Sequence, residues 1–172
     1  MKLLYSAVKN ADLDDALSGM YVDNIFTTEY DCYKIFYRQT GNQNAHKFLF
    51  LYNSSGKIVS NYSYSSVVIN NNGVANERAN VTGHGGTAWY PHNLRDWRYI
   101  GYGSITVWYP ADTTRKTLVH SRTKSVLTGN YYTHKDMATV DLTLQAVTGF
   151  GIQAYGIGED IEMLSVDVYG IK

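Results

Sequence analysis

The sequence predicts an all-β fold: an antiparallel β-sandwich of jelly-roll-like type, with at most one short N-terminal helix. Short runs of β-branched and aromatic residues recur along the chain. Within these runs apolar and polar side chains alternate with the period of two that strands require. Asn, Ser, Gly and Asp clusters separate the runs and favour tight turns. Together these observations predict about ten short strands.

The chain is expected to form one domain. Its 172 residues can bury one sizeable core, so we predict a single β-sandwich domain over 1–172, with 1–19 as a candidate N-terminal assembly arm. Cys32 is the single cysteine, which excludes an internal disulfide. We expect Cys32 to be a small core residue.

Tyrosine is unusually frequent, with 16 residues against 5 Phe and 3 Trp. Its apolar ring and polar hydroxyl suit half-buried strand surfaces and protein interfaces alike. Both interpretations stay open at the level of composition.

The first third of the chain alternates strand and turn patterns. Strands are expected over 3–8, 20–27, 31–38 and 46–52. The last of these is apolar on both faces, which predicts a central strand covered on both sides. The expected helix spans 10–17, because aspartates lie near its start and two leucines lie four residues apart.

The stretch 100–127 is the predicted central hairpin. A strand over 104–109 meets a polar corner at 110–114, and a second strand follows over 116–127. The second strand has a basic face, comprising Lys116, His120, Arg122 and Lys124 and interrupted only by Leu118. Its other face comprises Thr117, Val119, Ser121, Thr123 and Ser125. We therefore expect one hydrated face and one drier face.

The remaining strands are expected over 57–60, 62–69, 138–146 and 162–172. The strand over 138–146 has the most regular alternation in the chain. Glycines punctuate 149–158, but no Lys-Ser/Thr pair follows, so bends or bulges in strands are expected there rather than a nucleotide site.

Residues 83–98 form the predicted functional loop. They combine flexible glycines with aromatic side chains among polar ones. The candidate interface or glycan-contact residues are Trp89, Tyr90, Trp97 and Arg98, because Trp, Tyr and Arg dominate binding hot spots. The alternative is that the tryptophans fold back and cap the core.

No metal site and no cofactor is predicted. His84, His92 and Asp96 could converge on zinc, but zinc sites generally use three or four protein ligands, and many loop histidines bind no metal. The acidic run 12–15 lacks the glycine and distal glutamate of a calcium-binding loop.

The sequence is not expected to encode an enzyme. No Gly-x-Ser-x-Gly nucleophile elbow occurs. A glycosidase needs two carboxylates close in space, for which Asp141 and Asp167 are formal candidates. Solvated strand faces explain both aspartates more simply.

The charge balance argues against a nucleic-acid partner. Lys plus Arg and Asp plus Glu each number 15, so the net charge is zero. The N-terminal apolar run is too short for a signal peptide, and no stretch is long enough to span a membrane. We expect synthesis in a cytoplasm and no membrane partner.

The ending Ser-Val-Asp-Val-Tyr-Gly-Ile-Lys, residues 165–172, resembles the closing strand of β-sandwich proteins from bacteriophage virions, where a Tyr-Gly-Ile-Lys-type terminus recurs. Segments 103–112 and 116–121 are similar to a strand, corner and strand in such proteins. The resemblance extends loosely over 100–172 and has no counterpart for the loop 83–98. It implies a structural part of a tail, fibre or capsid surface, located in the virion, and brings no catalytic residues.

Three functional hypotheses follow from the sequence. The first is a non-enzymatic virion structural protein that assembles with its own copies and with other virion proteins. The second is a carbohydrate-binding module, whose loop aromatics would stack on a host-surface glycan. The third, and least favoured, is a glycan-cleaving enzyme.

Overall fold

A computed structural model describes the fold over residues 1–10, 19–41, 46–58, 62–70, 73–81, 92–93, 99–126, 132–141, 143–155 and 161–172. Over these ranges the regular structure is entirely β, which confirms the predicted fold class. The helix expected over 10–17 lies outside them except for Asn10, which is the last residue of β1.

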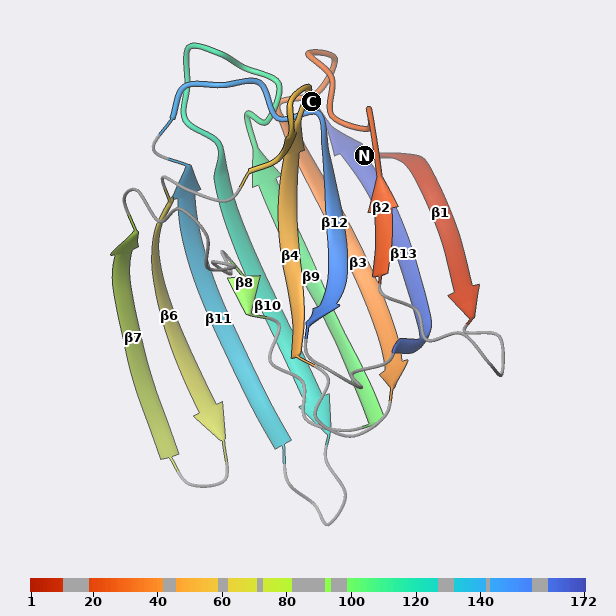
Figure 1. Ribbon diagram of the computed structural model, residues 1–172, viewed down its shortest axis with the longest axis vertical. Coiled ribbons are helices and arrows are strands. Elements are labelled where there is room, and N and C mark those ends of the chain that lie inside the picture. The colour runs from red at the N-terminus through yellow and green to blue at the C-terminus, as the bar shows by residue number, and fades with distance from the viewer. Residues whose placement is uncertain are drawn as a thin grey trace.

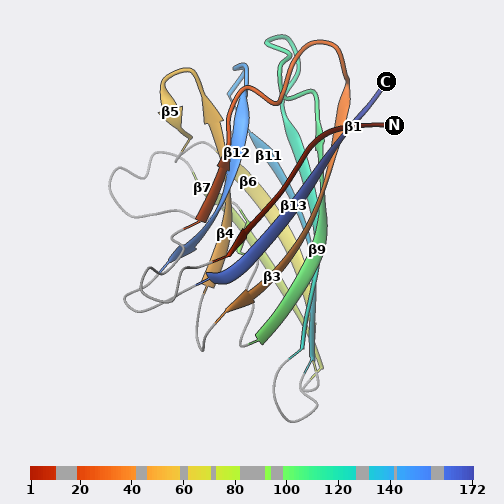
Figure 2. The ribbon, with the colours of Figure 1, turned by 90° about the vertical axis from the view of Figure 1, so that its right-hand side faces the viewer.

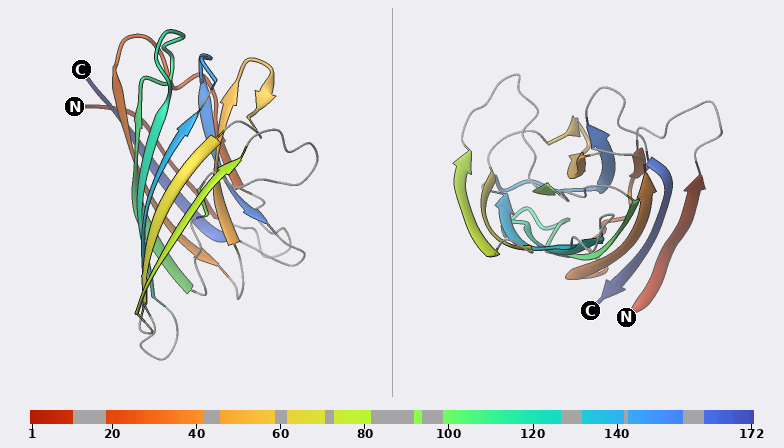
Figure 3. Two further views of the ribbon diagram at one scale, coloured as in Figure 1. Left: turned by 90° about the vertical axis from the view of Figure 1, so that its left-hand side faces the viewer. Right: turned by 90° about the horizontal axis from the view of Figure 1, so that it is seen from below.

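The strands form two antiparallel sheets. In order across the larger sheet they are β1 (Lys2–Asn10), β13 (Ile161–Ile171), β3 (Cys32–Gly41), β9 (Tyr99–Trp108), β10 (Leu118–Val126), β11 (Tyr132–Asp141), β6 (Tyr62–Asn70) and β7 (Gly73–Val81). The smaller sheet contains β2 (Gly19–Val22), β12 (Gly149–Tyr155), β4 (His46–Asn53) and β5 (Gly56–Lys57), and β8 (His92–Asn93) also pairs with β4. The larger sheet curves around the smaller one (Figure 1, Figure 3).

The strand order follows a jelly-roll winding. β1 pairs with β13 in the larger sheet, and β2 pairs with β12 in the smaller one. β3 then takes the second edge of β13, and β4 takes the second edge of β12. Pairing of the first strands with the last ones, followed by pairing of the next strands on their other edges, is the jelly-roll arrangement of two Greek keys. Beyond this unit, β10, β11, β6 and β7 extend the larger sheet.

The β9–β10 hairpin lies near the centre of the larger sheet, as predicted. The drier face is confirmed, because Thr117, Val119, Ser121 and Thr123 are buried. Lys116, Leu118, Arg122 and Lys124 are exposed on the opposite face. This exposed side of the larger sheet, turned away from the smaller sheet, is called the outer face below.

The prediction for β4 is confirmed as well. Leu49, Phe50 and Leu51 are consecutive and at most 1% exposed, so both sides of the strand are covered. Leu49 and Leu51 belong to the core between the sheets. On the other side, Lys57 Nζ lies 3.3 Å from the centroid of the Phe50 ring.

A chain of aromatic rings connects the two sheets. Phe150 of β12 stacks on Phe26 at 5.9 Å between ring centroids, and Phe26 meets Tyr33 of β3 edge-on at 4.8 Å. Tyr33 in turn contacts Tyr30 at 5.8 Å. Tyr30, Tyr33 and Tyr37 are all buried. These three tyrosines are therefore core residues, which neither interpretation of the composition anticipated.

Three expectations about the elements were wrong. The strand predicted over 20–27 ends at Val22, and Asn24 adopts a φ of 54° that strands do not allow. The strand predicted over 138–146 ends at Asp141, and Leu144 is 55% exposed. No strand was expected where β7 forms.

Cys32 is also not the core residue that the sequence suggested. The inward positions of β3 are taken by Tyr33, Ile35 and Tyr37, so the alternation of the strand places Cys32 on the outer face. It is a half-buried free thiol, and this burial raises the pKa of the thiol.

Candidate functional site

The interface residues predicted from the sequence are not placed by the structure. Trp89, Tyr90, Trp97 and Arg98 lie outside the described residues, and their role remains a prediction. Within the predicted loop 83–98 the structure describes only β8, which pairs with Phe48 and Leu49 of β4.

The described loops meet at one end of the sandwich, at the top of Figure 1. The Val147 amide donates to the Pro110 carbonyl at 2.6 Å, and the Thr148 amide donates to the Tyr52 carbonyl at 2.8 Å. The Phe26 amide donates to the Thr148 carbonyl at 3.1 Å. The segment 143–148 thus ties the β9–β10 corner to β4 and to the β2–β3 connection. We call this region the loop end.

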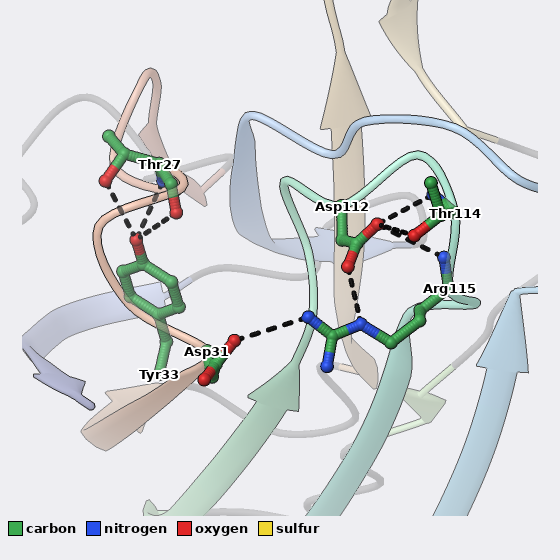
Figure 4. Close-up of polar contacts among 6 residues, drawn as sticks. All are labelled: Thr27, Asp31, Tyr33, Asp112, Thr114 and Arg115. Carbon is green, nitrogen blue, oxygen red and sulfur yellow. Dashed lines mark hydrogen bonds and ion pairs between the residues drawn. The ribbon is translucent and has the colours of Figure 1, made fainter.

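Asp112 organises the β9–β10 corner (Figure 4). Its Oδ1 accepts hydrogen bonds from the Thr114 amide and the Thr114 hydroxyl, both at 2.7 Å. Its Oδ2 accepts a hydrogen bond from Arg115 Nε. The bonds from Thr114, and then the one from Arg115, hold the pKa of Asp112 well below its ordinary value.

Arg115 connects this corner to the β2–β3 connection. Its guanidinium lies 3.8 Å from the centroid of the Tyr109 ring and forms an ion pair with Asp31 at 3.4 Å. A hollow of about 230 Å³ opens between the two loops. Arg115 is the cation among the described residues that line this hollow, and it is already engaged by two carboxylates and a ring.

We expect Asp112→Asn to lower the free energy of unfolding at neutral pH, because an amide cannot offer Arg115 a full negative charge. The folded-state pKa lies below the ordinary value of 3.8. The stabilisation is therefore fully present above that value and declines as the pH falls below it. Urea unfolding at neutral pH and near pH 2.5 measures this. An unchanged difference between variant and wild type at both pH values would contradict it.

The C-terminal Tyr-Gly-Ile-Lys segment packs against the β2–β3 connection. The Tyr30 ring lies over Gly170, where a Cβ atom would come within 2.7 Å of the ring. Lys172 Nζ lies 5.6 Å from the centroid of the same ring and 3.7 Å from Glu29. The buried Tyr33 hydroxyl donates to the Thr27 carbonyl at 2.9 Å and accepts from the Thr27 amide at 2.7 Å (Figure 4). The segment thus anchors the β2–β3 connection.

A second hollow at the loop end is built on the smaller sheet. It measures about 400 Å³ and is lined by Tyr21, Asp23, Asn24, Tyr52, Asn53, Ser54, Gly56 and Thr148. We call it the tyrosine hollow. The rings of Tyr21 and Tyr52 meet edge-on at 5.7 Å between centroids. Burial, and then the neighbouring Tyr21 phenol, raise the pKa of Tyr52.

Gly151 makes this ring pair sterically possible. It lies on β12, between β2 and β4. A Cβ atom there would lie 2.9 Å from Tyr21 and 3.1 Å from Tyr52. The sequence offered a signal, since a glycine within a strand marks a place where other groups approach closely. The two tyrosines themselves carried no such signal.

The outer face bears an ion cluster. Asp136 accepts hydrogen bonds from His120 Nε2 and, at 2.9 Å, from Arg122 Nε. Burial alone would raise the pKa of Asp136, but these two partners outweigh it and lower the pKa. All three side chains are at least 31% exposed, so the cluster is a solvated feature of the outer face.

The two aspartates considered as a glycosidase pair do not lie close together. Asp167 lies on β13 and Asp141 on β11, with β3, β9 and β10 between them. Four strand spacings correspond to about 19 Å along the sheet, well beyond the separation of catalytic carboxylates. Asp167 instead accepts a hydrogen bond from the Ser6 hydroxyl at 2.6 Å.

No group of three or more metal-ligating side chains occurs among the described residues. Of the ligands considered from the sequence, His84, Asp96 and the run 12–15 lie outside those residues, as does the His92 side chain. Nor does the described part of the chain hold a helix with the length and apolarity needed to cross a membrane.

Comparisons with known proteins give no relative: no family model matches the chain, and neither a curated protein nor a solved structure matches it. These comparisons give no support to the resemblance of the C-terminal segment to virion proteins, which stays a prediction.

Proposed function

We propose that this protein is a non-enzymatic structural component of a bacteriophage virion, in the tail, fibre, baseplate or capsid decoration. It would act by assembling with its own copies and with other virion proteins. The C-terminal resemblance and the jelly-roll winding support this proposal, since double-sheet jelly rolls include viral capsid domains. The same fold occurs in lectins, so the fold alone does not choose the function.

The observation that carries the assembly role is the edge strand β1. It pairs with β13 along one side, and no strand among the described residues pairs with its other side. Leu3 and Val8 on this strand are 51% and 59% exposed. A long edge strand with apolar side chains is a template for pairing with another chain.

A second copy suits this edge. If two β1 strands pair antiparallel about Ser6, Tyr5 lies opposite Ala7, and the two larger sheets continue into one. A contact of this kind is isologous and closes as a dimer.

Sedimentation analysis over a wide concentration range tests this contact. We expect the wild type to self-associate and the Leu3→Lys/Val8→Lys variant to remain monomeric, because lysines at an edge oppose strand pairing. Val67→Lys/Ile69→Lys is the matched control, since both residues are 38% exposed on β6, away from β1. A monomeric wild type, or equal dissociation of the control, would refute the proposed contact.

Mass spectrometry of purified particles from a host culture that expresses the chain tests the virion role. The chain is expected in the particles at a stoichiometry that reflects a repeated component. Its absence from them would remove the virion assignment while leaving the β1 contact to be judged separately. Carbohydrate binding through Trp89 and Trp97 stays a prediction, because neither residue is described.

A further inference from the structure

We propose that the tyrosine hollow is a binding subsite for a neutral saccharide. This inference is independent of the assembly role, because the hollow lies at the loop end of the smaller sheet whereas β1 is the edge of the larger one. Its described lining residues fall within 21–24, 52–56 and at 148, so they are distinct from the residues predicted as a site in the loop 83–98.

The hollow has the size and surface of a small-molecule site. Its volume of about 400 Å³ lies within the range of ligand pockets. Tyr21 remains 43% exposed at its edge, although an aromatic ring gains free energy from burial. The C–H face of a pyranose ring is apolar and flat, so it can cover such a ring while its hydroxyls stay hydrated at the rim.

The ring pair is held in place before any ligand arrives. Tyr52 is partly buried and fixes Tyr21 from the side in the edge-on contact. Gly151 leaves the space beneath both rings, so neither ring is displaced by a side chain of β12. A rigid, preformed aromatic surface lowers the entropy lost on binding.

Polar groups converge on the same hollow. Asp23 and Asn24 directly follow β2 and line it, and Asn24 is fixed in a left-handed conformation with a φ of 54°. Their side chains make no hydrogen bond with the other described residues. A carboxylate beside a carboxamide offers acceptors and donors together, which matches the mixed character of vicinal sugar hydroxyls.

The charge of the lining selects the class of saccharide. Among the described residues that line the hollow, Asp23 is the single ionisable group apart from the tyrosine phenols, and none is a lysine or an arginine. A uronate, sialate or phosphate group would meet the Asp23 carboxylate with no cation among these lining residues to compensate it, which is unfavourable. The ligand is therefore a neutral saccharide rather than an acidic one.

Saturation-transfer NMR and titration calorimetry test the subsite with the full chain. The probes are neutral oligosaccharides, namely α-1,4-, β-1,3- and β-1,4-glucans, a β-1,4-mannan and a chitin oligomer, with a galacturonate oligomer as the acidic arm. We expect at least one neutral probe to bind with a Kd of about 1 mM or tighter. We expect the acidic probe not to bind.

The variants separate stacking from general disruption. Tyr21→Ala is expected to weaken binding by about tenfold or more, whereas Tyr21→Phe keeps the ring and stays within about threefold of wild type. Asp23→Ala should weaken binding as Tyr21→Ala does. Tyr102→Ala is the matched control, because Tyr102 is 47% exposed on the outer face and lies away from the hollow. It should leave the affinity unchanged.

Three results would overturn the subsite: no neutral probe binds, the acidic probe binds as well as the neutral ones, or Tyr102→Ala weakens binding as much as Tyr21→Ala. Circular dichroism confirms that each variant is folded. The Leu3→Lys/Val8→Lys variant should bind saccharide with wild-type affinity. Loss of self-association and loss of saccharide binding are thereby distinguished.

Discussion

Phe150→Ala is expected to lower the free energy of unfolding by about 3–5 kcal/mol, the range for removing a large aromatic side chain from a core. Phe150 is fully buried on β12. Its ring stacks on Phe26, the first contact in the chain of rings that joins the smaller sheet to the larger one. Alanine would leave a cavity between the sheets and would remove the support of Phe26.

Urea unfolding monitored by tyrosine and tryptophan fluorescence measures this loss. Phe36→Ala is the matched control, because Phe36 is 38% exposed on the outer face. Its ring contacts Tyr169 at 5.8 Å between centroids, so the control should cost about 1 kcal/mol. If the two variants were equally destabilised, the chain of rings would not be the main link between the sheets.

Gly103→Ala is expected to destabilise the protein by about 3 kcal/mol, at the upper end of the usual cost of overpacking. Gly103 lies on β9, in the middle of the larger sheet. A Cβ atom there would lie 2.5 Å from the Arg122 carbonyl oxygen and 2.7 Å from the buried Tyr37 ring. The first obstacle is backbone of the neighbouring strand, so a side-chain rotation cannot relieve it.

Gly170→Ala separates a fixed obstacle from a movable one. Its closest neighbours are atoms of the Tyr30 ring, at 2.7 to 2.8 Å. Because that ring can shift, we expect a smaller cost of about 1–2 kcal/mol. Thermal unfolding of both variants measures the difference. A larger loss for Gly170→Ala than for Gly103→Ala would show that the β9–β10 backbone adjusts more easily than the Tyr30 packing.

The features of the fold that depend on local patterning could be predicted. The period-two alternation of β10 assigned its buried and exposed faces correctly, because a strand with one covered face fixes the side of every residue. The apolar run of β4 likewise predicted a strand covered on both sides. The ends of β2 and β11 could not be predicted, because apolar residues continue beyond both strands. There the chain bonds to other segments, as Phe26 does to Thr148 and Val147 to Pro110.

The buried tyrosines illustrate a second limit. Tyr33 is fully buried, and its hydroxyl is satisfied by the backbone of Thr27. Nothing in the sequence around Tyr33 indicates that a loop will fold back to provide this partner. Composition alone therefore assigned tyrosine to surfaces and interfaces, although three tyrosine side chains belong to the core.

The tyrosine hollow could not be predicted for a related reason. Tyr21, Tyr52 and Gly151 lie on three strands that are far apart in the sequence. They come together only through the winding that places β12 between β2 and β4. The aromatic residues of the loop 83–98 could be grouped from the sequence because they are neighbours in the chain. Residues that come together only through the fold cannot be grouped in this way.

The pairing of β1 with β13 has a mechanical consequence. Lys2 lies opposite Gly170, so the first and last residues of the chain are neighbours at one edge of the sheet (Figure 2). A tensile force applied through both ends would peel the two strands apart one hydrogen-bonded pair at a time, because the load falls on the terminal pair first. A force that shears two paired strands along their length loads all their hydrogen bonds at once. A force on the adjacent ends of β1 and β13 loads their hydrogen bonds one after another instead, so the pair resists it less.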